Sequence, residues 1–328
     1  MKLAVRKESW PLAAPFRITN YVFSAADIVV VELSDGGATG RGEAAGVYYL
    51  GETADTLTGQ IEAVRGRIEA GIDREGLRAL LPPGGARNAL DAALWDLEAR
   101  RSGQPVWKLA GLEAPHPLLT TFTVSAGAPA EMASAAEGFT SAKAIKIKLT
   151  GTDPADCVRA VRAARPDVWL GVDANQGFDR AALEALTPTL VASHVALVEQ
   201  PARMGEDATL DGLERPIPLA ADESAQSLAD LPRLADRYDV INIKLDKCGG
   251  LTEGLAMAAE ARRLGLKVMV GCMSGTSLAM APAFVLGQAA EIVDLDSPVF
   301  LTGDRPTPAV YEDGRIWCPP ELWGSPDA

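Results

Sequence analysis

The spacing of apolar positions along the chain changes near residue 115. Before that point the chain begins with strand-like segments, including DIVVVEL and a turn at Asp35-Gly36-Gly37, and continues with helical segments. In ARNALDAALWDLEARRSG the apolar residues recur at helical spacing until a glycine and a proline end the pattern. This arrangement predicts a small α+β domain over residues 1–115.

Short apolar segments alternate with helical patterns from residue 116 to residue 298. Eight of these segments are typical of strands: LTTFTVS, AIKIKL, VWLGVDAN, VALVEQP, IPLAADES, VINIKLDK, KVMVGCM and EIVDLDSP. Repeating strand–helix units build parallel sheets, and eight of them close into a barrel. The sequence therefore predicts an α/β protein with a barrel over residues 116–298. We expect the proline-rich residues 299–328 to return to the first domain.

Charged residues end several of the predicted barrel strands. Counted from Lys148, the next ones are Asp173, Glu199, Asp222 and Lys244, at steps of 25, 26, 23 and 22 residues. One strand–helix unit of a barrel takes roughly 25–30 residues, so each step advances by one strand. Because barrel enzymes build their active sites at the C-terminal ends of the strands, we expect these side chains to converge there.

Three of the converging groups are carboxylates: Asp173, Glu199 and Asp222. Oxygen ligands in this number are typical of a Mg²⁺ site, for which Mn²⁺ is the common substitute. Each acid alone could instead cap the helix that follows its strand. Three acids on successive strands make a metal site the better explanation.

Two of the lysines, Lys146 and Lys148, lie two residues apart on one strand and therefore point the same way. In a half-exposed strand such lysines would be solvated, but a barrel strand between apolar neighbours has no solvated face. Lysines close to one another and to a cation favour the neutral amine. We therefore expect their pKa values to be lowered into the range of a base.

The third lysine, Lys244, lies four strands beyond Lys148 and therefore across the eight-stranded ring. A base on one side of a carbon atom and an acid on the other allow that carbon to be inverted. Lys146 and the cation would stabilise the enediolate formed in between. Lys247 follows the strand beside two glycines, and we expect it to be a loop residue rather than a proton carrier.

Two further acids, Asp294 and Asp296, share one face of the last predicted strand. They could be a solvated strand end before Pro298. At a barrel mouth, however, paired carboxylates suit the ammonium group of a substrate.

The composition of the chain limits the classes of molecule that it is expected to bind. The chain has 31 Lys and Arg against 44 Asp and Glu, a net charge of −13, which disfavours nucleic acids and anionic membranes. No apolar run reaches the ~18 residues of a membrane span, and the start lacks a signal-peptide pattern, so we expect a cytoplasmic protein. The four cysteines form no CxxC and are expected to be reduced.

The motifs of this chain, taken together, resemble those of the enolase superfamily. They are ARNALDAALWDL, the two lysines of KIK, DAN, EQP, ADES, NIKLDKCGG, GCMSGTS and DLD. Within the superfamily the chain is similar to the muconate-lactonising subgroup, and the DLD is the mark of its dipeptide epimerases. The resemblance implies a modified TIM barrel, (β/α)₇β, with an α+β capping domain formed by the N-terminal region and the C-terminal tail.

The resemblance also implies a role for each site residue. Lys148 and Lys244 would be the acid/base pair, and Lys146 would neutralise the substrate carboxylate. The Mg²⁺ ligands would be Asp173, Glu199 and Asp222. Asp294 and Asp296 would hold the N-terminal ammonium of a dipeptide. Other residues expected to line the pocket are Thr123, Cys272, Met273 and Ser274.

The N-terminal stretch ITNYVFSAAD departs from the pattern of the resembling family. Members that act on L-Ala-D/L-Glu often carry a basic residue near this point. Here Asn20, Tyr21, Val22 and Phe23 occupy the stretch, and Arg17 lies earlier. We expect Tyr21 and Phe23 to favour an uncharged or apolar second residue, with L-Ala-D/L-Glu as the other option.

Other functions stay open on the same scaffold. N-succinylamino acid racemisation, o-succinylbenzoate synthesis and cycloisomerisation also need two lysines and a metal, but their substrates have no ammonium group to occupy the DLD pair. A barrel that only binds a ligand is disfavoured by the retention of all three acids and both lysines. The expected partners are a small dipeptide and further copies of the chain in a homo-oligomer, with no nucleic acid and no membrane.

Overall fold

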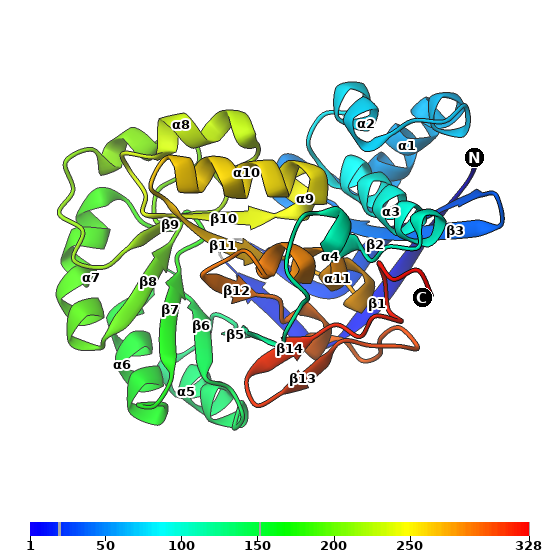
Figure 1. Ribbon diagram of the computed structural model, residues 1–328. Coiled ribbons are helices and arrows are strands. Elements are labelled where there is room, and N and C mark those ends of the chain that lie inside the picture. Colours follow the sequence, from blue (N-terminus) through cyan, green and yellow to red (C-terminus); the bar gives the residue numbers. More distant parts are fainter. Residues whose placement is uncertain (19–20, 151, 328) are drawn as a thin grey trace.

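The computed structural model describes residues 1–18, 21–150 and 152–327 of the chain. At the N-terminal end, an antiparallel sheet is formed in this order by β1 (Lys2–Ile18), β2 (Tyr21–Asp35) and β3 (Ala38–Ala45) (Figure 1). Successive residues of β2 face opposite ways, as the pleat of a strand requires. Ile28 and Val30 join the core shared with the barrel, while Val29 and Val31 pack among apolar residues of the neighbouring helices.

The helices beside this sheet complete the cap, which we define as residues 1–102. After the short turn η1 (Tyr48–Leu50) they are α1 (Ala54–Glu69), α2 (Arg74–Leu80) and α3 (Gly85–Ser102), and α4 (Val106–Leu109) follows. Helix α3 is almost wholly buried and lies directly on β3, because Gly42 leaves no side chain between them. A Cβ atom at Gly42 would lie only 2.0 Å from the carbonyl oxygen of Ala89.

Eight parallel strands follow, as the sequence predicts. In chain order they are β5 (Thr121–Val124), β6 (Ala144–Lys148), β7 (Trp169–Asp173), β8 (Val195–Glu199), β9 (Leu219–Ala221), β10 (Val240–Lys244), β11 (Lys267–Gly271) and β12 (Ile292–Asp294). The connecting helices are α5 (Pro129–Gly138), α6 (Pro154–Ala164), α7 (Arg180–Ala192), α8 (Leu231–Leu234), α9 (Leu245–Cys248), α10 (Leu251–Arg263) and α11 (Ser277–Gly287). Short 3₁₀ turns are η2 (Asp207–Leu210), η3 (Leu228–Asp230) and η4 (Ser297–Phe300). The predicted α/β barrel with an α+β cap is confirmed.

The first and last strands of the barrel, β5 and β12, meet through a seam of side-chain bonds. The Thr121 hydroxyl donates to the carboxylate of Asp294, and the backbone N–H of Thr123 donates to Asp296 Oδ2 over 2.6 Å. In return, the backbone N–H of Leu295 donates to the hydroxyl of Thr120 over 3.0 Å. Residues of the DLD motif therefore help to close the ring.

The C-terminal tail contacts both parts of the molecule. Its strands β13 (Val310–Glu312) and β14 (Arg315–Trp317) form a hairpin, and β14 also pairs with β4 (Leu118–Leu119) beside the barrel. The tail then reaches the cap, where the indole of Trp323 donates to the carbonyl oxygen of Arg41 over 2.8 Å. The division of the chain at residues 115 and 298 stays a prediction. None of the helices in the described ranges combines the length and apolar character that crossing a membrane needs.

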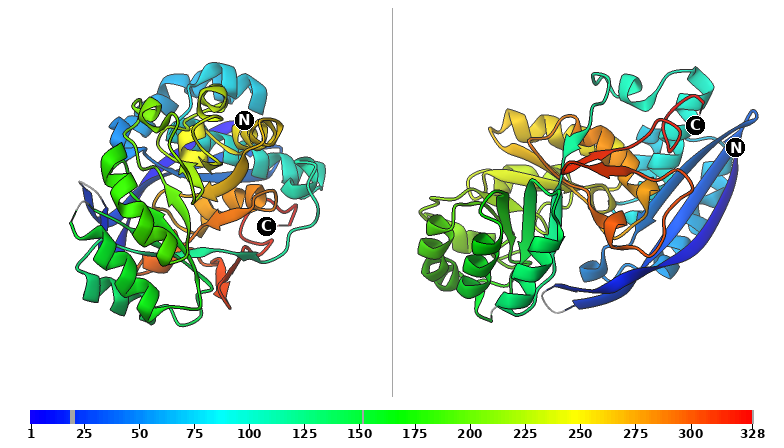
Figure 2. Two further views of the ribbon diagram at one scale, coloured as in Figure 1. Left: turned by 90° about the vertical axis from the view of Figure 1, so that its left-hand side faces the viewer. Right: turned by 90° about the horizontal axis from the view of Figure 1, so that it is seen from below.

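Two contacts of the cap with the barrel bear on the site. The long β1–β2 hairpin runs from the cap along the barrel (Figure 2), and the N–H of Ala126 after β5 donates to the Arg17 carbonyl oxygen over 3.2 Å. The second contact is made by helix α3, which forms hydrogen bonds with the segment that follows β10. Asn88 donates to Asp246 Oδ1 over 3.1 Å, and Asp91 accepts from the N–H of Thr252 over 3.0 Å.

Candidate active site

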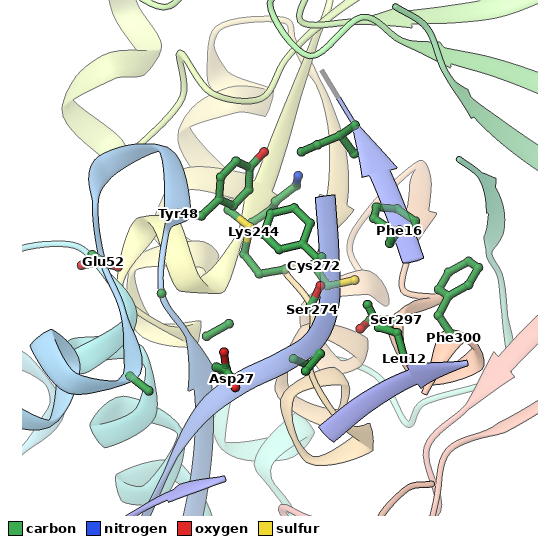
Figure 3. Close-up of a pocket in the computed structure, with 18 of the residues that line it drawn as sticks. Leu12, Phe16, Asp27, Tyr48, Glu52, Lys244, Cys272, Ser274, Ser297 and Phe300 are labelled. Carbon is green, nitrogen blue, oxygen red and sulfur yellow. The ribbon is translucent and has the colours of Figure 1, made fainter. Parts of the chain in front are cut away.

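The polar ends of the barrel strands surround one cavity of about 530 Å³. Its barrel side is lined by the expected residues Thr123, Lys146, Lys148, Lys244, Cys272, Met273, Ser274, Asp294 and Asp296. Its cap side is lined by the hairpin and the Tyr48 turn, and Figure 3 shows Tyr48 beside Lys244 at one end and Phe16 beside Phe300 at another. The convergence expected from the spacing of charged residues is therefore present.

The three predicted metal ligands lie together beneath this cavity. Asp173, Glu199 and Asp222 are fully buried, and one oxygen from each lies within 4.8 Å of the others. Glu199 Oε1 accepts a hydrogen bond of 2.6 Å from Asn242, whereas its buried Oε2 accepts none from the described residues. Lys146 Nζ lies 3.0 Å from this oxygen, but three carboxylates held so close together repel one another unless a further cation lies between them. The three residues therefore fit a divalent metal with a preference for oxygen ligands.

Each lysine of the site is paired with a carboxylate. Lys148 Nζ lies 2.6 Å from Asp173 Oδ2, and Lys244 Nζ lies 2.6 Å from Asp222 Oδ2. Lys146 contacts Asp294 and lies 3.0 Å from Glu199 Oε2. Strands β6 and β10 are four positions apart in the barrel order, so Lys148 and Lys244 approach the cavity from opposite sides.

The pKa values of Lys146 and Lys244 are both raised by the carboxylates beside them. Burial alone lowers the pKa of Lys244, but the carboxylate of Asp222 and three further acids raise it well above its ordinary value. The pKa of Lys146 is raised well above its ordinary value in the same way, with Asp294 and Glu199 outweighing burial. The lowered pKa expected for Lys146 concerns a site with a bound cation and stays a prediction; among the side chains alone, the carboxylates that stand closer determine the direction.

The pKa values of three acids of the site are shifted as well. Burial and the nearby charge of Asp173 raise the pKa of Glu199 to about 7. Burial and the charge of Asp294 raise the pKa of Asp296 to about 7. Burial would also raise the pKa of Asp294, but Lys146 outweighs this effect and lowers it. The site thus holds more carboxylates than its lysines neutralise, which suits it to a divalent cation and a substrate ammonium.

The DLD pair is buried, so the alternative of a solvated strand end is wrong. Asp294 is 4% exposed and Asp296 is 5% exposed, and both line the cavity. Thr123 also lines the cavity, and its backbone N–H holds Asp296. The pair therefore lies at the cavity wall, on the seam that closes the barrel.

The hairpin places Tyr21 and Phe23, which the sequence assigned to the same pocket, in different surroundings. Phe23 lines the cavity, whereas Tyr21 is 40% exposed and does not belong to the described lining. The Tyr21 ring stacks on Phe23, with ring centres 6.1 Å apart, and meets the edge of Tyr48. Arg17 and Tyr21 border a different hollow. Asn20, which the sequence placed in the same stretch, lies outside the described residues.

The expectation that Lys247 is a loop residue is wrong. It lies in the one-turn helix α9, its side chain is fully buried, and its Nζ lies 2.5 Å from Asp222 Oδ1. The helix begins directly at the end of β10 and turns the side chain back beneath the site. One sign of this buried position is present in the sequence. Lys247 comes three residues after the strand-end Lys244 and shortly before Gly249 and Gly250.

A second group that the sequence did not reveal binds Thr276, two residues after the Cys272-to-Ser274 segment. Buried Glu43 of β3 accepts from the N–H of Thr276 over 2.7 Å and pairs with Arg305 of the tail over 2.6 Å. Arg305 also pairs with Glu8 of β1 over 2.8 Å. The cap, the β11–α11 loop and the tail are thus tied together beside the cavity.

Comparisons with known proteins agree with this architecture. Residues 1–111 match the N-terminal domain of mandelate racemase / muconate lactonizing enzymes, and residues 127–322 match the enolase C-terminal domain-like family. The L-Ala-D/L-Glu epimerase of Escherichia coli is 42% identical, over 95% of this chain and 98% of its own. A hydrophobic dipeptide epimerase of Roseobacter litoralis is 33% identical, over 92% and 91%.

A solved structure is also close. An enolase family member from Agrobacterium tumefaciens, with homology to dipeptide epimerases and with bound sodium and L-Ala-L-Glu, superimposes with a TM-score of 0.96. It is 42% identical and covers 98% of this chain and 99% of that one. The matches to both halves of the chain show that it belongs to the mandelate racemase/muconate lactonizing enzyme family of the enolase superfamily.

Proposed function

We propose that this protein is a Mg²⁺-dependent dipeptide epimerase that inverts the α-carbon of the C-terminal residue of an L,L-dipeptide. The observation that carries the proposal is the placement of Lys148 and Lys244 on opposite sides of one cavity, above three buried carboxylates. The epimerase relatives that match nearly the whole chain support it.

The reaction is a transfer of one proton off and another onto the same carbon. One lysine, as the neutral amine, removes the α-proton on its face, and the other donates a proton on the opposite face. Lys146 adds positive charge where the substrate carboxylate becomes an enediolate. When bound at Asp173, Glu199 and Asp222, Mg²⁺ supplies further positive charge to that carboxylate and makes the α-proton more acidic.

The DLD pair selects a substrate with a free amino terminus. Asp294 and Asp296 offer buried carboxylate oxygens at the cavity wall, and an ammonium group can donate charge-assisted hydrogen bonds to both. Substrates of N-succinylamino acid racemases and o-succinylbenzoate synthases lack such a group. They would offer these two acids no ammonium hydrogens.

The cavity favours an uncharged, apolar second residue over glutamate. Apart from the three lysines at the reaction centre, the only Lys or Arg in the described lining is Lys7, and its Nζ is already 2.5 Å from Asp55. The hairpin side of the cavity presents Phe16 and Phe23. A glutamate side chain would lose its hydration there without gaining a partner of opposite charge.

The proposal is tested by proton–deuterium exchange. The protein is incubated with Mg²⁺ and a panel of L,L-dipeptides in D₂O, and the α-proton of the C-terminal residue is followed by NMR. We expect exchange accompanied by epimerisation, and neither with N-succinylated amino acids. Exchange in the N-succinylated set alone would favour the racemase alternative, and no exchange with any dipeptide would reject the proposal.

A further inference from the structure

We propose that Lys247 is a positioning residue that holds the end of β9 against the end of β10, so that Asp222 and Lys244 meet in one fixed geometry. The inference rests on the proposed epimerase function and deepens it. Lys247 is buried beside the site but is not among the described residues that line the cavity, so it has no access to a substrate carbon.

The ammonium group of Lys247 uses all of its donors within the protein. It donates to Asp222 Oδ1 over 2.5 Å, to the backbone carbonyl oxygen of Asp222, and to the carbonyl oxygen of Asn242 over 3.1 Å. A lysine ammonium has three hydrogens, so no donor is left for a ligand. Two acceptors stand at the end of β9 and the third stands on β10. Lys247 therefore bridges two neighbouring strands just where they present their functional side chains.

This bridge divides the two oxygens of Asp222. Lys247 takes Oδ1, and Lys244 takes Oδ2 over 2.6 Å. Because Oδ1 is fixed to an immobile partner, the plane of the carboxylate is fixed and Oδ2 can point only toward the cavity side. The Nζ of Lys244 is thereby held at one place. Without Lys247, the Asp222 carboxylate would be free to rotate and would carry Lys244 with it.

The opposite face of the site uses a different device. Asp173 is held at Oδ1 by the backbone N–H of Asn175 over 2.8 Å, while its Oδ2 meets Lys148 over 2.6 Å. A backbone N–H therefore fixes the aspartate that pairs with Lys148, whereas the Lys247 side chain fixes the aspartate that pairs with Lys244. Removing the Lys247 ammonium should consequently disturb one face of the reaction and leave the other in place.

The segment that carries Lys247 is itself rigid. Arg87 of α3 donates to the backbone carbonyls of Cys248 and Gly249, and Asn88 donates to Asp246 Oδ1 over 3.1 Å. These contacts hold α9 from the cap side. A change confined to the Lys247 side chain would therefore remove the ammonium without moving the helix that bears it.

The test compares Lys247→Met with wild type in the full-length protein. The α-proton exchange of an L,L- and an L,D-dipeptide is measured in D₂O, and the isomer whose exchange is abolished by Lys244→Ala defines the Lys244 face. We expect Lys247→Met to slow exchange on that face by about 100-fold, since a misplacement near 1 Å costs this much. Exchange on the Lys148 face should change less than about threefold. The control is Lys267→Met, which replaces an exposed lysine at the first position of β11. It should leave the exchange rates on both faces unchanged.

A second readout does not depend on catalysis. Calorimetric titration with Mg²⁺ should show about tenfold weaker binding to Lys247→Met, because Asp222 must then be ordered when the metal binds. Equal slowing of both faces, or unchanged exchange with unchanged Mg²⁺ affinity, would overturn the positioning role. If Lys247→Met does not fold, Lys247→Gln, which keeps an N–H donor, is measured in the same way. Should wild type exchange no dipeptide at all, the proposed function fails, and the titration still decides the role of Lys247.

Discussion

At the scale of single residues, each buried lysine of this site is defined by the carboxylate oxygen that it meets. Lys148 and Lys244 each meet the Oδ2 atom of an aspartate from the cluster of three carboxylates, at the same distance of 2.6 Å. Lys146, on the same strand as Lys148, meets Asp294 and Glu199 instead. The symmetry of the first pair about the cavity is what a two-face proton transfer requires.

Removing either member of that pair should separate exchange from inversion. Lys148→Ala and Lys244→Ala should each abolish epimerisation, because one face then lacks its proton donor. Each variant should still exchange the α-proton of one stereoisomer, a different one in each case. NMR in D₂O with both stereoisomers measures this directly. Epimerisation that survives Lys244→Ala would show that the two-face assignment is wrong.

Phe23 should control the choice of the second residue. Wild type should have a higher kcat/KM for L-Ala-L-Leu or L-Ala-L-Phe than for L-Ala-L-Glu. Phe23→Arg should shift that ratio toward L-Ala-L-Glu by roughly tenfold or more, since a hydrogen bond to a charged group contributes about 1.5–3 kcal/mol. Tyr21→Arg is the matched control on the same hairpin and should not shift it, because Tyr21 lies outside the described lining. A clear wild-type preference for L-Ala-L-Glu would contradict the argument.

At the scale of elements, the joint between α3 and the start of α10 depends on glycines with unusual backbone angles. Gly249 and Gly250 have φ values of +81° and +117°, which side chains rarely adopt. A Cβ at Gly250 would also lie 2.4 Å from Asp91 Oδ2. The close approach allows Asp91 to accept from the backbone N–H of Thr252 at the beginning of α10.

Gly250→Ala should therefore destabilise the protein more than its backbone angle alone would suggest. Gly265 offers the comparison, because its φ is +78° and nothing lies within 4 Å of its missing Cβ. Gly265→Ala should lower the free energy of unfolding by about 1 kcal/mol, and Gly250→Ala by about 3 kcal/mol or more. Urea unfolding of both variants measures the difference. Equal losses would mean that Asp91 moves aside at little cost.

The sequence predicted most of this element arrangement and the convergence of its polar ends. Eight strands at steps near one strand–helix unit are enough to place Lys148, Asp173 and Lys244 around one mouth. The sequence could not show that Lys247 turns back under Asp222, because strand periodicity ends where the short helix α9 begins. Nor could it pair Glu43 with Arg305, since these residues are 262 positions apart and no local pattern links them.

The hairpin illustrates a different limit. Tyr21 and Phe23 are two residues apart, and the period of a strand assigns them to one face. The structure nevertheless lines the cavity with Phe23 alone, while Tyr21 packs on its outer side. Whether a residue on the correct face reaches a cavity depends on how far the strand extends past its partner. That distance is a tertiary property and is not encoded by alternation.

At the scale of the whole molecule, the cap and the barrel share buried acids whose protonation affects stability. Burial raises the pKa of Asp91 to about 6, although hydrogen bonds from Thr252 oppose the shift. An aspartate in an unfolded chain has a pKa near 3.9. Because the folded pKa is the higher one, the folded state binds the proton more tightly. The contribution of Asp91 to stability is thus fully present below pH ~4 and is lost as the pH rises through 6.

Asp91→Asn should remove this part of the pH dependence. Between pH 5 and pH 8 the wild-type stability should fall relative to the variant by about 1.4 kcal/mol, the value of one pKa unit. The loss of hydrogen bonds to Thr252 adds an offset that is the same at both pH values. Urea unfolding of both proteins at pH 5 and pH 8 isolates the difference. Parallel stability curves would show that Asp91 stays ionised in the folded protein throughout.

The seam between β5 and β12 has a consequence for how such a protein can diverge. The two aspartates of the DLD motif, which line the cavity, also accept the hydrogen bonds by which Thr121 and Thr123 close the ring. A descendant that turned to substrates without an amino group could not simply discard these acids. It would have to supply other hydrogen-bond acceptors to the seam at the same time. A change of substrate specificity would therefore require compensating substitutions that keep the barrel closed.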